Sequence, residues 1–265
     1  MNATPPRGPS AFAARRRATA AMDTCMTTEP LFADDAYLKT CTARVVAVEE
    51  KGVVLDRTVL YARSGGQPGD SGTLRWDGGE AAVAEAIKGA EPGVILHGLA
   101  PGATPPPVGA EVAVGLDWDR RHRHMRMHTT MHLLCTLLPG VYATGNQIGA
   151  EKSRLDFDLP EPPAPAWFTE GLNALIAADH ETGSSWITDA ELDANPQMVR
   201  TLSVQPPRGA GRIRLVRIGP AEAPIDLQPC GGTHVKRLSE IGRVEVTRIE
   251  SKGRQNRRIH FILVD

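Results

Sequence analysis

No hydrophobic run in this sequence is long enough to span a membrane as a helix. Cysteine is scarce, with 4 in 265 residues, and the irregular spacing of these residues excludes a disulfide framework. Few cysteines without a pairing pattern favour a reducing cytoplasm as the location of the protein.

The N-terminal segment, residues 1–25, lacks an apolar stretch and has no acidic residue before Asp23. The missing apolar stretch excludes a secretory signal. The segment is rich in alanine, proline and arginine, which resembles a transit peptide but is also typical of a disordered extension. We expect the disordered extension, with Met22 or Met26 as the start of the protein proper.

Residues 26–117 contain short β segments separated by glycine-rich turns, a spacing that predicts a small all-β barrel or sandwich. We expect a glycine-rich β-barrel domain over this range. The segments are Ala43–Val48, Gly52–Asp56, Thr58–Ala62, Gly72–Trp76, Ala81–Ile87, Gly93–Leu99 and Ala110–Leu116.

The stretch from Ser64 to Gly72, SGGQPGDSG, has too much glycine for an ordinary hairpin turn. It lacks the Gly-Lys-Ser/Thr ending of a phosphate-binding loop and no helix follows it. Either its backbone N–H groups line a cleft or it is a plain structural loop.

The stretch Asp119–Leu138 predicts a helix that carries His128 and His132. Residues four apart lie on one helical face, so both imidazoles can reach one metal ion. Cys230 and His234 repeat this spacing about a hundred residues later, in a Gly-Gly loop. Three imidazoles and one thiolate suit a tetrahedral zinc site.

Other assignments remain open for this helix. A lone pair of histidines at this spacing is often an ordinary surface or core pair, and the added Cys230 and His234 favour the metal. His124 and Cys135 share the same helical face, so by their angle around the helix each is an alternative ligand. We expect Cys135 to be a buried small hydrophobe and His124 to be solvated or close to RNA.

The second half mixes helix and strand patterns. Strand patterns cover Ser153–Asp158, Arg212–Ile218, Gly242–Ile249 and Arg257–Val264, and Ala166–His180 is an amphipathic helix. We therefore expect an α+β fold: the N-terminal β-barrel, then a domain over residues 118–265 with an antiparallel sheet and the metal-bearing helix.

Charge is balanced overall, with a formal net charge of −1, but it is placed unevenly. Basic residues lie at Arg120, Arg121, Arg123 and Arg126 beside the metal helix, and again between Lys252 and Arg258. A basic zone around a reactive centre favours a polyanionic substrate, and a solvated charged surface is the alternative.

Several motifs together resemble the AlaX family, free-standing proteins similar to the editing domain of alanyl-tRNA synthetase. The threonyl-tRNA synthetase editing domain is a more distant relative. The resemblance covers about Tyr37 to Asp265. The motifs are SGGQPGDSG, HTTMHLL, TGNQ, SRLDFD, QPCGGTHV, EIGRV and SKGRQNRRI.

The resemblance implies a zinc-dependent deacylase that removes the wrong amino acid from mischarged tRNA-Ala. Its oligomeric state, monomer or homodimer, stays open. Seryl-tRNA-Ala is the expected substrate, with glycyl-tRNA-Ala as a second. The chain lacks an aminoacylation domain, so we expect it to correct charged tRNA and not to make it. The implied zinc ligands are His128, His132, Cys230 and His234.

The remaining candidate site residues divide into two groups. Gln147 and Thr129 are the candidate catalytic residues. The candidate substrate-binding residues are Gly65, Gly66, Gln67, Arg154, Asp156, Gly231, Gly232 and Thr233.

Two other functions compete with the deacylase. One is a zinc-stabilised RNA-binding module without catalysis, because four protein ligands are typical of a structural zinc site. The other is a zinc hydrolase of a small amino-acid ester, which the basic C-terminal half disfavours.

Overall fold

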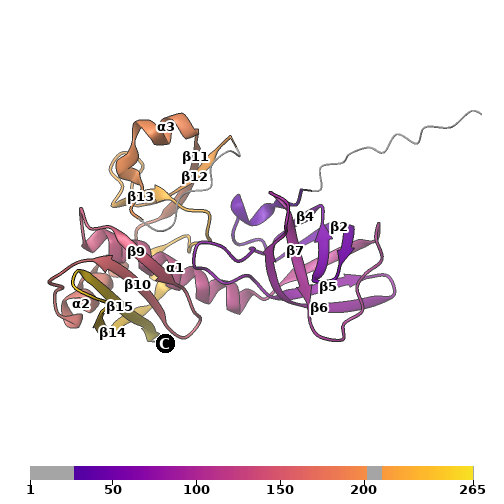
Figure 1. Cartoon of the computed structure of the whole chain (residues 1–265), viewed down its shortest axis with the longest axis horizontal. Helices are drawn as coiled ribbons and strands as arrows, with labels where there is room; N and C mark the ends of the chain where they lie inside the picture. The colour runs from indigo at the N-terminus through magenta and orange to yellow at the C-terminus, as the bar shows by residue number, and fades with distance from the viewer. Residues whose placement is uncertain (1–26, 202–210, 265) are drawn as a thin grey trace, which may run out of the picture.

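The computed structural model describes residues 27–201 and 211–264. These residues form a closed barrel of six strands, a long helix α1 that leads out of it, and a second half with two antiparallel sheets (Figure 1). The expected mixture of helices with a barrel and antiparallel sheets is confirmed. The proposed extension over residues 1–25 lies outside the described residues. No described helix is long and apolar enough to cross a membrane.

The barrel has the strand order β2-β3-β7-β6-β5-β8. Side chains along β6 and β8 alternate between buried and exposed, the two-residue period of a strand with one face inward. The inward residues, among them Leu55, Leu74 and Val112, form a core inside the barrel. The strands span Thr40–Glu49 (β2), Gly52–Leu55 (β3), Gly72–Trp76 (β5), Gly79–Lys88 (β6), Ile95–Leu99 (β7) and Glu111–Leu116 (β8).

The strand expected at Thr58–Ala62 is wrong over most of its length. Only Arg57–Thr58 forms a strand, β4, which pairs with β1 (Glu29–Pro30). Residues 59–62 are buried but pair with no strand. Side chains bond to their backbone groups where a neighbouring strand would otherwise do so. The Tyr61 amide donates to Asp70 Oδ2 at 2.6 Å, and the Val59 carbonyl accepts from Arg121 Nη2 at 2.7 Å. The apolar pattern therefore indicated burial, not strand pairing.

Helix α1 spans Trp118–Leu137. The Asp117 carboxylate caps its start by accepting from the Arg120 amide at 3.2 Å, and Gly140 follows its end with a φ of 78°. With 20 residues the helix is about 30 Å long, enough to connect the barrel with the second half.

The second half has two sheets. The four-stranded sheet has the order β14-β15-β10-β9, and α2 packs on it through Phe168, Leu172 and Ile176. The three-stranded sheet has the order β11-β12-β13. The strands are Ala143–Gln147 (β9), Ser153–Asp158 (β10), Thr182–Ile187 (β11), Ile213–Ile218 (β12), Asp226–Pro229 (β13), Arg243–Ser251 (β14) and Asn256–Val264 (β15). The helices are Pro165–Ala177 (α2) and Asp189–Ala194 (α3), with short 3-10 turns at Leu31–Ala33, Pro196–Met198 and Leu238–Ile241.

The three-stranded sheet is the element that the sequence pattern predicts least. Strand β11 is exposed over Ser184, Ser185 and Trp186, so it lacks the alternation of a half-buried strand. The position of this sheet matters for the site, because its edge strand β13 leads directly into Cys230.

Candidate metal centre

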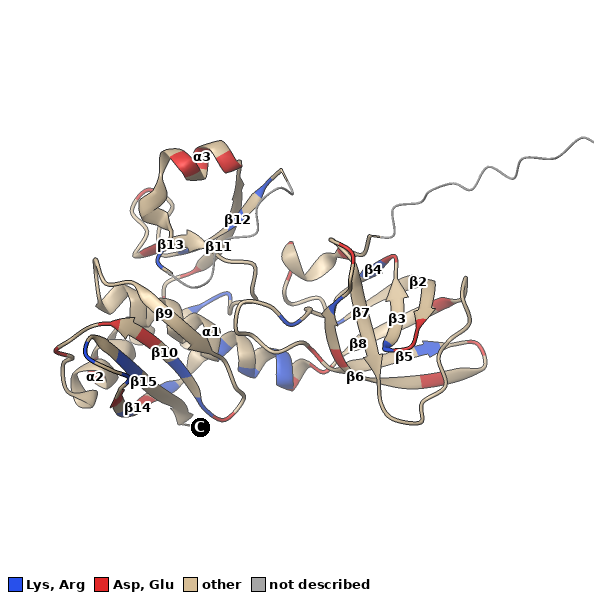
Figure 2. Cartoon of the chain, viewed as in Figure 1, with Lys and Arg blue, Asp and Glu red and all other residues tan. Residues whose placement is uncertain are grey.

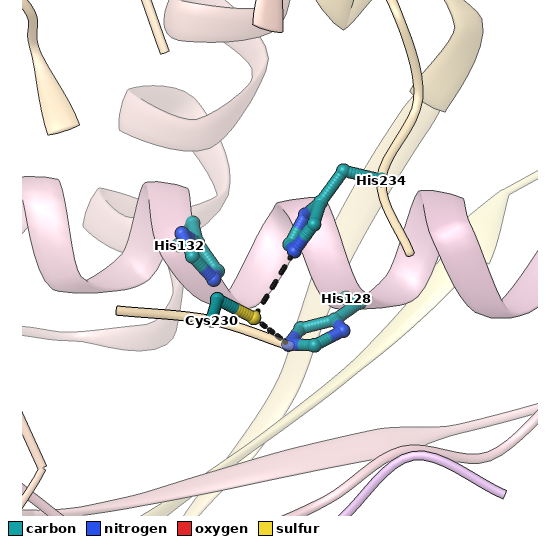
Figure 3. A group of neighbouring side chains, drawn as sticks. All are labelled: His128, His132, Cys230 and His234. Carbon is teal, nitrogen blue, oxygen red and sulfur yellow. Dashed lines mark hydrogen bonds between the residues drawn. The ribbon is translucent and has the colours of Figure 1, made fainter. Parts of the chain in front are cut away.

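Four side chains from two distant parts of the chain meet beside α1. His128 and His132 project from the helix, and Cys230 and His234 come from the loop after β13 (Figure 3). Their candidate ligand atoms all lie within 4.8 Å of one another, so the four groups are placed to hold one metal ion. Cys230 Sγ lies 3.5 Å from His128 Nε2 and 3.3 Å from His234 Nε2. A tetrahedral zinc ion requires N···S edges of about 3.5 Å.

The barrel holds His128. His128 Nδ1 lies 2.9 Å from Oε1 of Gln67, in the glycine-rich loop. The same Oε1 accepts from the Thr233 amide at 3.1 Å, and Gln67 Nε2 donates to the Thr233 hydroxyl at 2.8 Å. Gln67 and Thr233, expected to bind substrate, are fully buried. In this structure they join the barrel, the helix and the Cys230 loop.

Asp226 in β13 holds His132. His132 Nδ1 lies 2.7 Å from Asp226 Oδ2, and Gln228 Nε2 donates to both oxygens of the same carboxylate at 2.9 and 3.1 Å. Asp226 and Gln228 were absent from the sequence-based set. A sequence signal for them was present. Asp226, Gln228 and Cys230 occupy every second position and so share one face of an extended strand.

Thr129 holds His234. Its hydroxyl donates to the Met125 carbonyl at 2.9 Å, accepts from the Val235 amide at 3.3 Å and lies 3.2 Å from His234 Nδ1. Thr129 is fully buried. Thr129 is therefore placed to position His234, and its catalytic role stays a prediction from the sequence.

The three histidines share one arrangement. Each places Nδ1 on an oxygen of a neighbouring side chain, and oxygens of Gln67 and Asp226 accept there. With Nδ1–H donating outward, each Nε2 keeps its lone pair for a metal. This tautomer is assigned from the hydrogen-bond partners. The donor set and its orientation therefore fit a bound metal ion.

Electrostatics inside the cluster favour ligand-competent forms. Burial raises the pKa of the Cys230 thiol, but His128 and His234 outweigh it and hold the pKa well below its ordinary value, which favours the thiolate. Burial holds the pKa of His234 well below its ordinary value, so that imidazole is neutral. For His132, burial lowers the pKa, yet hydrogen bonds to Asp226 and Cys230 raise it to about 10. A metal at this site must displace the proton from His132 Nε2.

The cluster opens to solvent on the Cys230 side. The three histidines are buried, whereas Cys230 is only partly so and Gly231 is exposed. A Cβ on Gly231 would meet nothing within 4 Å, but a Cβ on Gly232 would come within 2.3 Å of His128 Cε1. Gly232 thus lets the loop approach the helix closely, and Gly231 borders open space.

The other expected site residues lie on β9, β10 and the glycine-rich loop. Gln147 is exposed, and its Oε1 accepts from Arg154 Nε at 3.3 Å. Arg154 Nη1 in turn donates to Asp156 Oδ2 at 2.8 Å. Gly65 and Gly66 are exposed, and a Cβ on Gly66 would overlap the Asn146 amide. Gln147, Arg154 and Asp156 are thus linked by hydrogen bonds, and none of them is a candidate metal ligand.

Two expectations around the helix need correction, and one is confirmed. His124 is 1% exposed, so it is not solvated; burial lowers its pKa to about 4. Arg121, expected to face tRNA, is fully buried and forms an ion pair with Asp70. Arg121 lies where α1 meets the barrel loop, so packing replaces solvent there. Cys135 is buried as expected, and burial raises its pKa to about 12.

Two known protein families match parts of this chain. Residues 213–260 match the threonyl and alanyl tRNA synthetase second additional domain, and residues 22–120 match the class II (A) tRNA synthetases. The first range contains Cys230 and His234, and the second contains the glycine-rich loop.

Individual relatives cover nearly the whole chain. The alanyl-tRNA editing protein AlaX-M of Methanosarcina mazei is 37% identical over 250 residues, which is 90% of this chain and 97% of the relative. AlaX-M of Saccharolobus solfataricus is 33% identical over 88% of this chain and 98% of its own length. An alanine–tRNA ligase of Pyrobaculum arsenaticum is 36% identical over 84% of this chain, which spans 25% of the ligase. The chain therefore belongs to the AlaX-M family of alanyl-tRNA editing proteins.

Proposed function

We propose that this chain is a cytoplasmic trans-editing hydrolase that deacylates mischarged tRNA-Ala with a bound zinc ion. Its zinc ligands are His128, His132, Cys230 and His234. The observation that carries the proposal is the converging set of three imidazoles and one cysteine sulfur, with Cys230 partly exposed, in a chain of the AlaX-M family. We further propose residues 26–117 as the barrel domain and 118–265 as the editing domain.

The donor set selects the metal. Three imidazole nitrogens and one thiolate suit zinc better than magnesium or calcium, which prefer oxygen ligands. When bound, zinc supplies electrostatic polarisation of an ester carbonyl and a fixed point for the substrate. The chain's own residues keep the site ready, because Gln67, Asp226 and Thr129 fix the three imidazoles before any ligand arrives.

Access from the Cys230 side sets where the aminoacyl end enters. Gly231 leaves open space beside the cluster, and the exposed Gly65, Gly66 and Gln147 are the remaining candidates for contact with the aminoacyl-adenosine. We assign them substrate contacts, and Gln147 remains the candidate for orienting the attacking water. An aminoacyl ester is already activated, so modest positioning is sufficient.

Serine is the favoured amino acid to be removed, with glycine as a second. Serine differs from alanine by one hydroxyl, and a pocket that hydrogen-bonds this hydroxyl leaves its own polar group unpaired when alanine binds. Such an unpaired group costs about 1–3 kcal/mol. The resulting discrimination is about ten- to a hundredfold for each polar group.

One observation favours the competing function, a zinc-stabilised RNA-binding module. Four protein ligands describe a closed site, whereas catalytic zinc sites usually have three protein ligands and an open position. The partial exposure of Cys230 favours the enzyme, because a purely structural site has no need of an open side.

Deacylation rates of three esters on the same tRNA-Ala test the proposal. We expect seryl-tRNA-Ala to lose its amino acid at least about tenfold faster than alanyl-tRNA-Ala, with glycyl-tRNA-Ala between them. Equal rates for serine and alanine would contradict the specificity. Binding of tRNA-Ala without hydrolysis of any ester would establish the RNA-binding module instead.

A further inference from the structure

Strand β12 places one arginine directly against the loop that carries two candidate ligands. Arg214 Nη1 donates to the carbonyls of Cys230 at 3.1 Å and Gly232 at 2.9 Å. The Arg214 carbonyl in turn accepts from the Cys230 amide at 3.0 Å. The two side-chain bonds fix the guanidinium, and the backbone bond fixes the strand, beside Cys230, the one partly exposed member of the metal cluster.

The opposite edge of this guanidinium has no hydrogen-bond partner among the described residues. Arg214 Nε is buried and makes no hydrogen bond to any residue of 27–201 or 211–264, and within these ranges Nη2 has no recorded bond either. No carboxylate among the described residues forms an ion pair with Arg214. A buried donor without an acceptor costs free energy, so its retention needs an explanation.

The charge of Arg214 is also poorly compensated. Burial lowers the pKa of Arg214, and the opposing electrostatic influences come from Cys230, Asp34 and Tyr61. A guanidinium removed from water without a paired carboxylate is unfavourable alone and favourable once an anion binds. The site is therefore suited to an anionic ligand.

The shape of the free edge selects the kind of anion. Nε–H and Nη2–H of a guanidinium point in parallel, and together they match two oxygens on one atom. A phosphate or carboxylate offers such a pair, whereas an ester carbonyl offers one oxygen. The substrate of the proposed deacylase has a phosphate on its terminal nucleotide and no carboxylate at the ester.

We propose that Arg214 binds the phosphate of the 3′-terminal nucleotide of tRNA through Nε and Nη2 and thereby positions the aminoacyl ester beside the metal cluster. This inference rests on the proposed function. Arg214 is a substrate-binding residue in this account, and its Nη1 keeps the Cys230 loop in the matching position. Gly231 lies between the two residues whose carbonyls Arg214 contacts, and a Cβ there would meet nothing within 4 Å, so this part of the loop leaves room for a ligand.

The test compares two non-hydrolysable ligands that differ only in that phosphate. One is 3′-seryl-amino-3′-deoxyadenosine, and the other has a 5′-phosphate in addition. The parent chain should bind the phosphorylated ligand about ten- to a hundredfold more tightly, the effect of hydrogen bonds to a charged group. Arg214→Gln should bind both ligands equally, and Arg214→Lys should retain part of the preference because it keeps charge but loses the two-pronged edge.

Arg217→Gln is the matched control. Arg217 lies three residues along the same strand and so on its opposite face, and its removal changes the net charge equally. Arg217→Gln should keep the full phosphate preference. Zinc content is measured for every variant, because Arg214 also supports the Cys230 loop.

Three results would overturn the inference: equal affinity of the parent for both ligands, an undiminished preference in zinc-loaded Arg214→Gln, or an equal loss in Arg217→Gln. If Arg214→Gln loses zinc, a full preference in Arg214→Lys overturns it and a reduced one supports it. Failure of the proposed function is seen separately, as a parent chain that leaves seryl-tRNA-Ala intact.

Discussion

At the scale of single residues, Asp226 has the largest expected influence on metal affinity. It is the charged partner among the three side chains that hold the histidines, and it is buried against His132 at 2.7 Å. A carboxylate on Nδ1 raises the basicity of the imidazole and fixes its ring. Gln67 and Thr129 offer neutral oxygens to the other two histidines and therefore orient more than they activate.

Asp226→Asn should weaken zinc binding by about ten- to a hundredfold, because the neutral amide no longer stabilises the His132 N–H donor. Zinc affinity is measured by competition with a chromophoric chelator. Glu222→Gln is the control, since Glu222 is exposed in the loop before β13 and should leave the affinity unchanged. Unchanged affinity in Asp226→Asn would show that the contact between Asp226 and His132 does not tune the metal.

The four candidate ligands could be predicted from the sequence because i,i+4 spacing on a helix is a local property. Their partners could not be predicted in the same way. Gln67 and His128 are 61 residues apart, and only the docking of the barrel loop on α1 brings them within 2.9 Å. Asp226 was within reach of a periodicity argument, because it alternates with Gln228 and Cys230 along one extended segment.

At the scale of elements, the pairing of β10 and β15 depends on a buried carboxylate. Asp156 in β10 accepts from Arg258 Nε and Nη2 in β15 at 2.9 and 2.8 Å and from Arg154 Nη1 at 2.8 Å. Burial raises the pKa of Asp156, but these arginines outweigh it and hold the pKa below its ordinary value. The sheet therefore gains stability from the ionised carboxylate.

Asp156→Asn should destabilise the chain by about 1.5–3 kcal/mol at neutral pH, the value of hydrogen bonds to charged groups. The lowered folded-state pKa means that this stabilisation is present above the unfolded pKa of about 3.9 and is lost as pH falls through the folded pKa. Urea unfolding at pH 6.5 and near pH 3 measures the difference between parent and variant. A difference that stays constant between the two pH values would contradict the ionised pairing.

Two arginines near the turn between β14 and β15 differ in their surroundings. Arg254 is exposed, whereas the Arg258 guanidinium donates to the Asp156 carboxylate. Figure 2 shows basic residues, in blue, on β15. Arg254→Ala should therefore flatten the slope of log affinity for tRNA against log salt by about one unit. Arg258→Ala should chiefly lower stability. Equal salt slopes for the parent and Arg254→Ala would remove this turn from the tRNA interface.

Strands could be predicted from the sequence where buried and exposed side chains alternate, and not where this alternation is missing. Strand β10 was predicted with its observed bounds, Ser153–Asp158, because Leu155 and Phe157 alternate with polar residues in sequence. Strand β11 is exposed along its centre, and the buried segment Val59–Ala62 is satisfied by Asp70 and Arg121 side chains. Neither situation leaves a periodic signal in the sequence.

At the scale of the whole molecule, the metal centre depends on the seating of the barrel loop on α1. Arg121 is fully buried and bonds to Asp70 Oδ2, to the Val59 carbonyl and to the Ala36 carbonyl. Asp70 lies three residues after Gln67 in the same loop. The buried pair therefore fixes the loop that delivers Gln67 to His128.

Arg121→Met should destabilise the chain by about 3–5 kcal/mol, because it leaves the Asp70 carboxylate buried without a counter-charge. The double variant Arg121→Met, Asp70→Leu should recover part of this loss, since it removes both charges. Urea unfolding of the parent and the variants measures the effect. A loss in the double variant as large as in the single one would show that the charge pairing is not the cause.

The rate of ester loss from seryl-tRNA-Ala, before and after metal removal, tests the central claim most directly. The account predicts rapid hydrolysis by the zinc-loaded chain, loss of hydrolysis in a chelator-treated sample that remains folded by circular dichroism, and recovery when one equivalent of zinc per chain is restored. Hydrolysis that continues at the same rate in a chain shown to be free of metal would contradict the account.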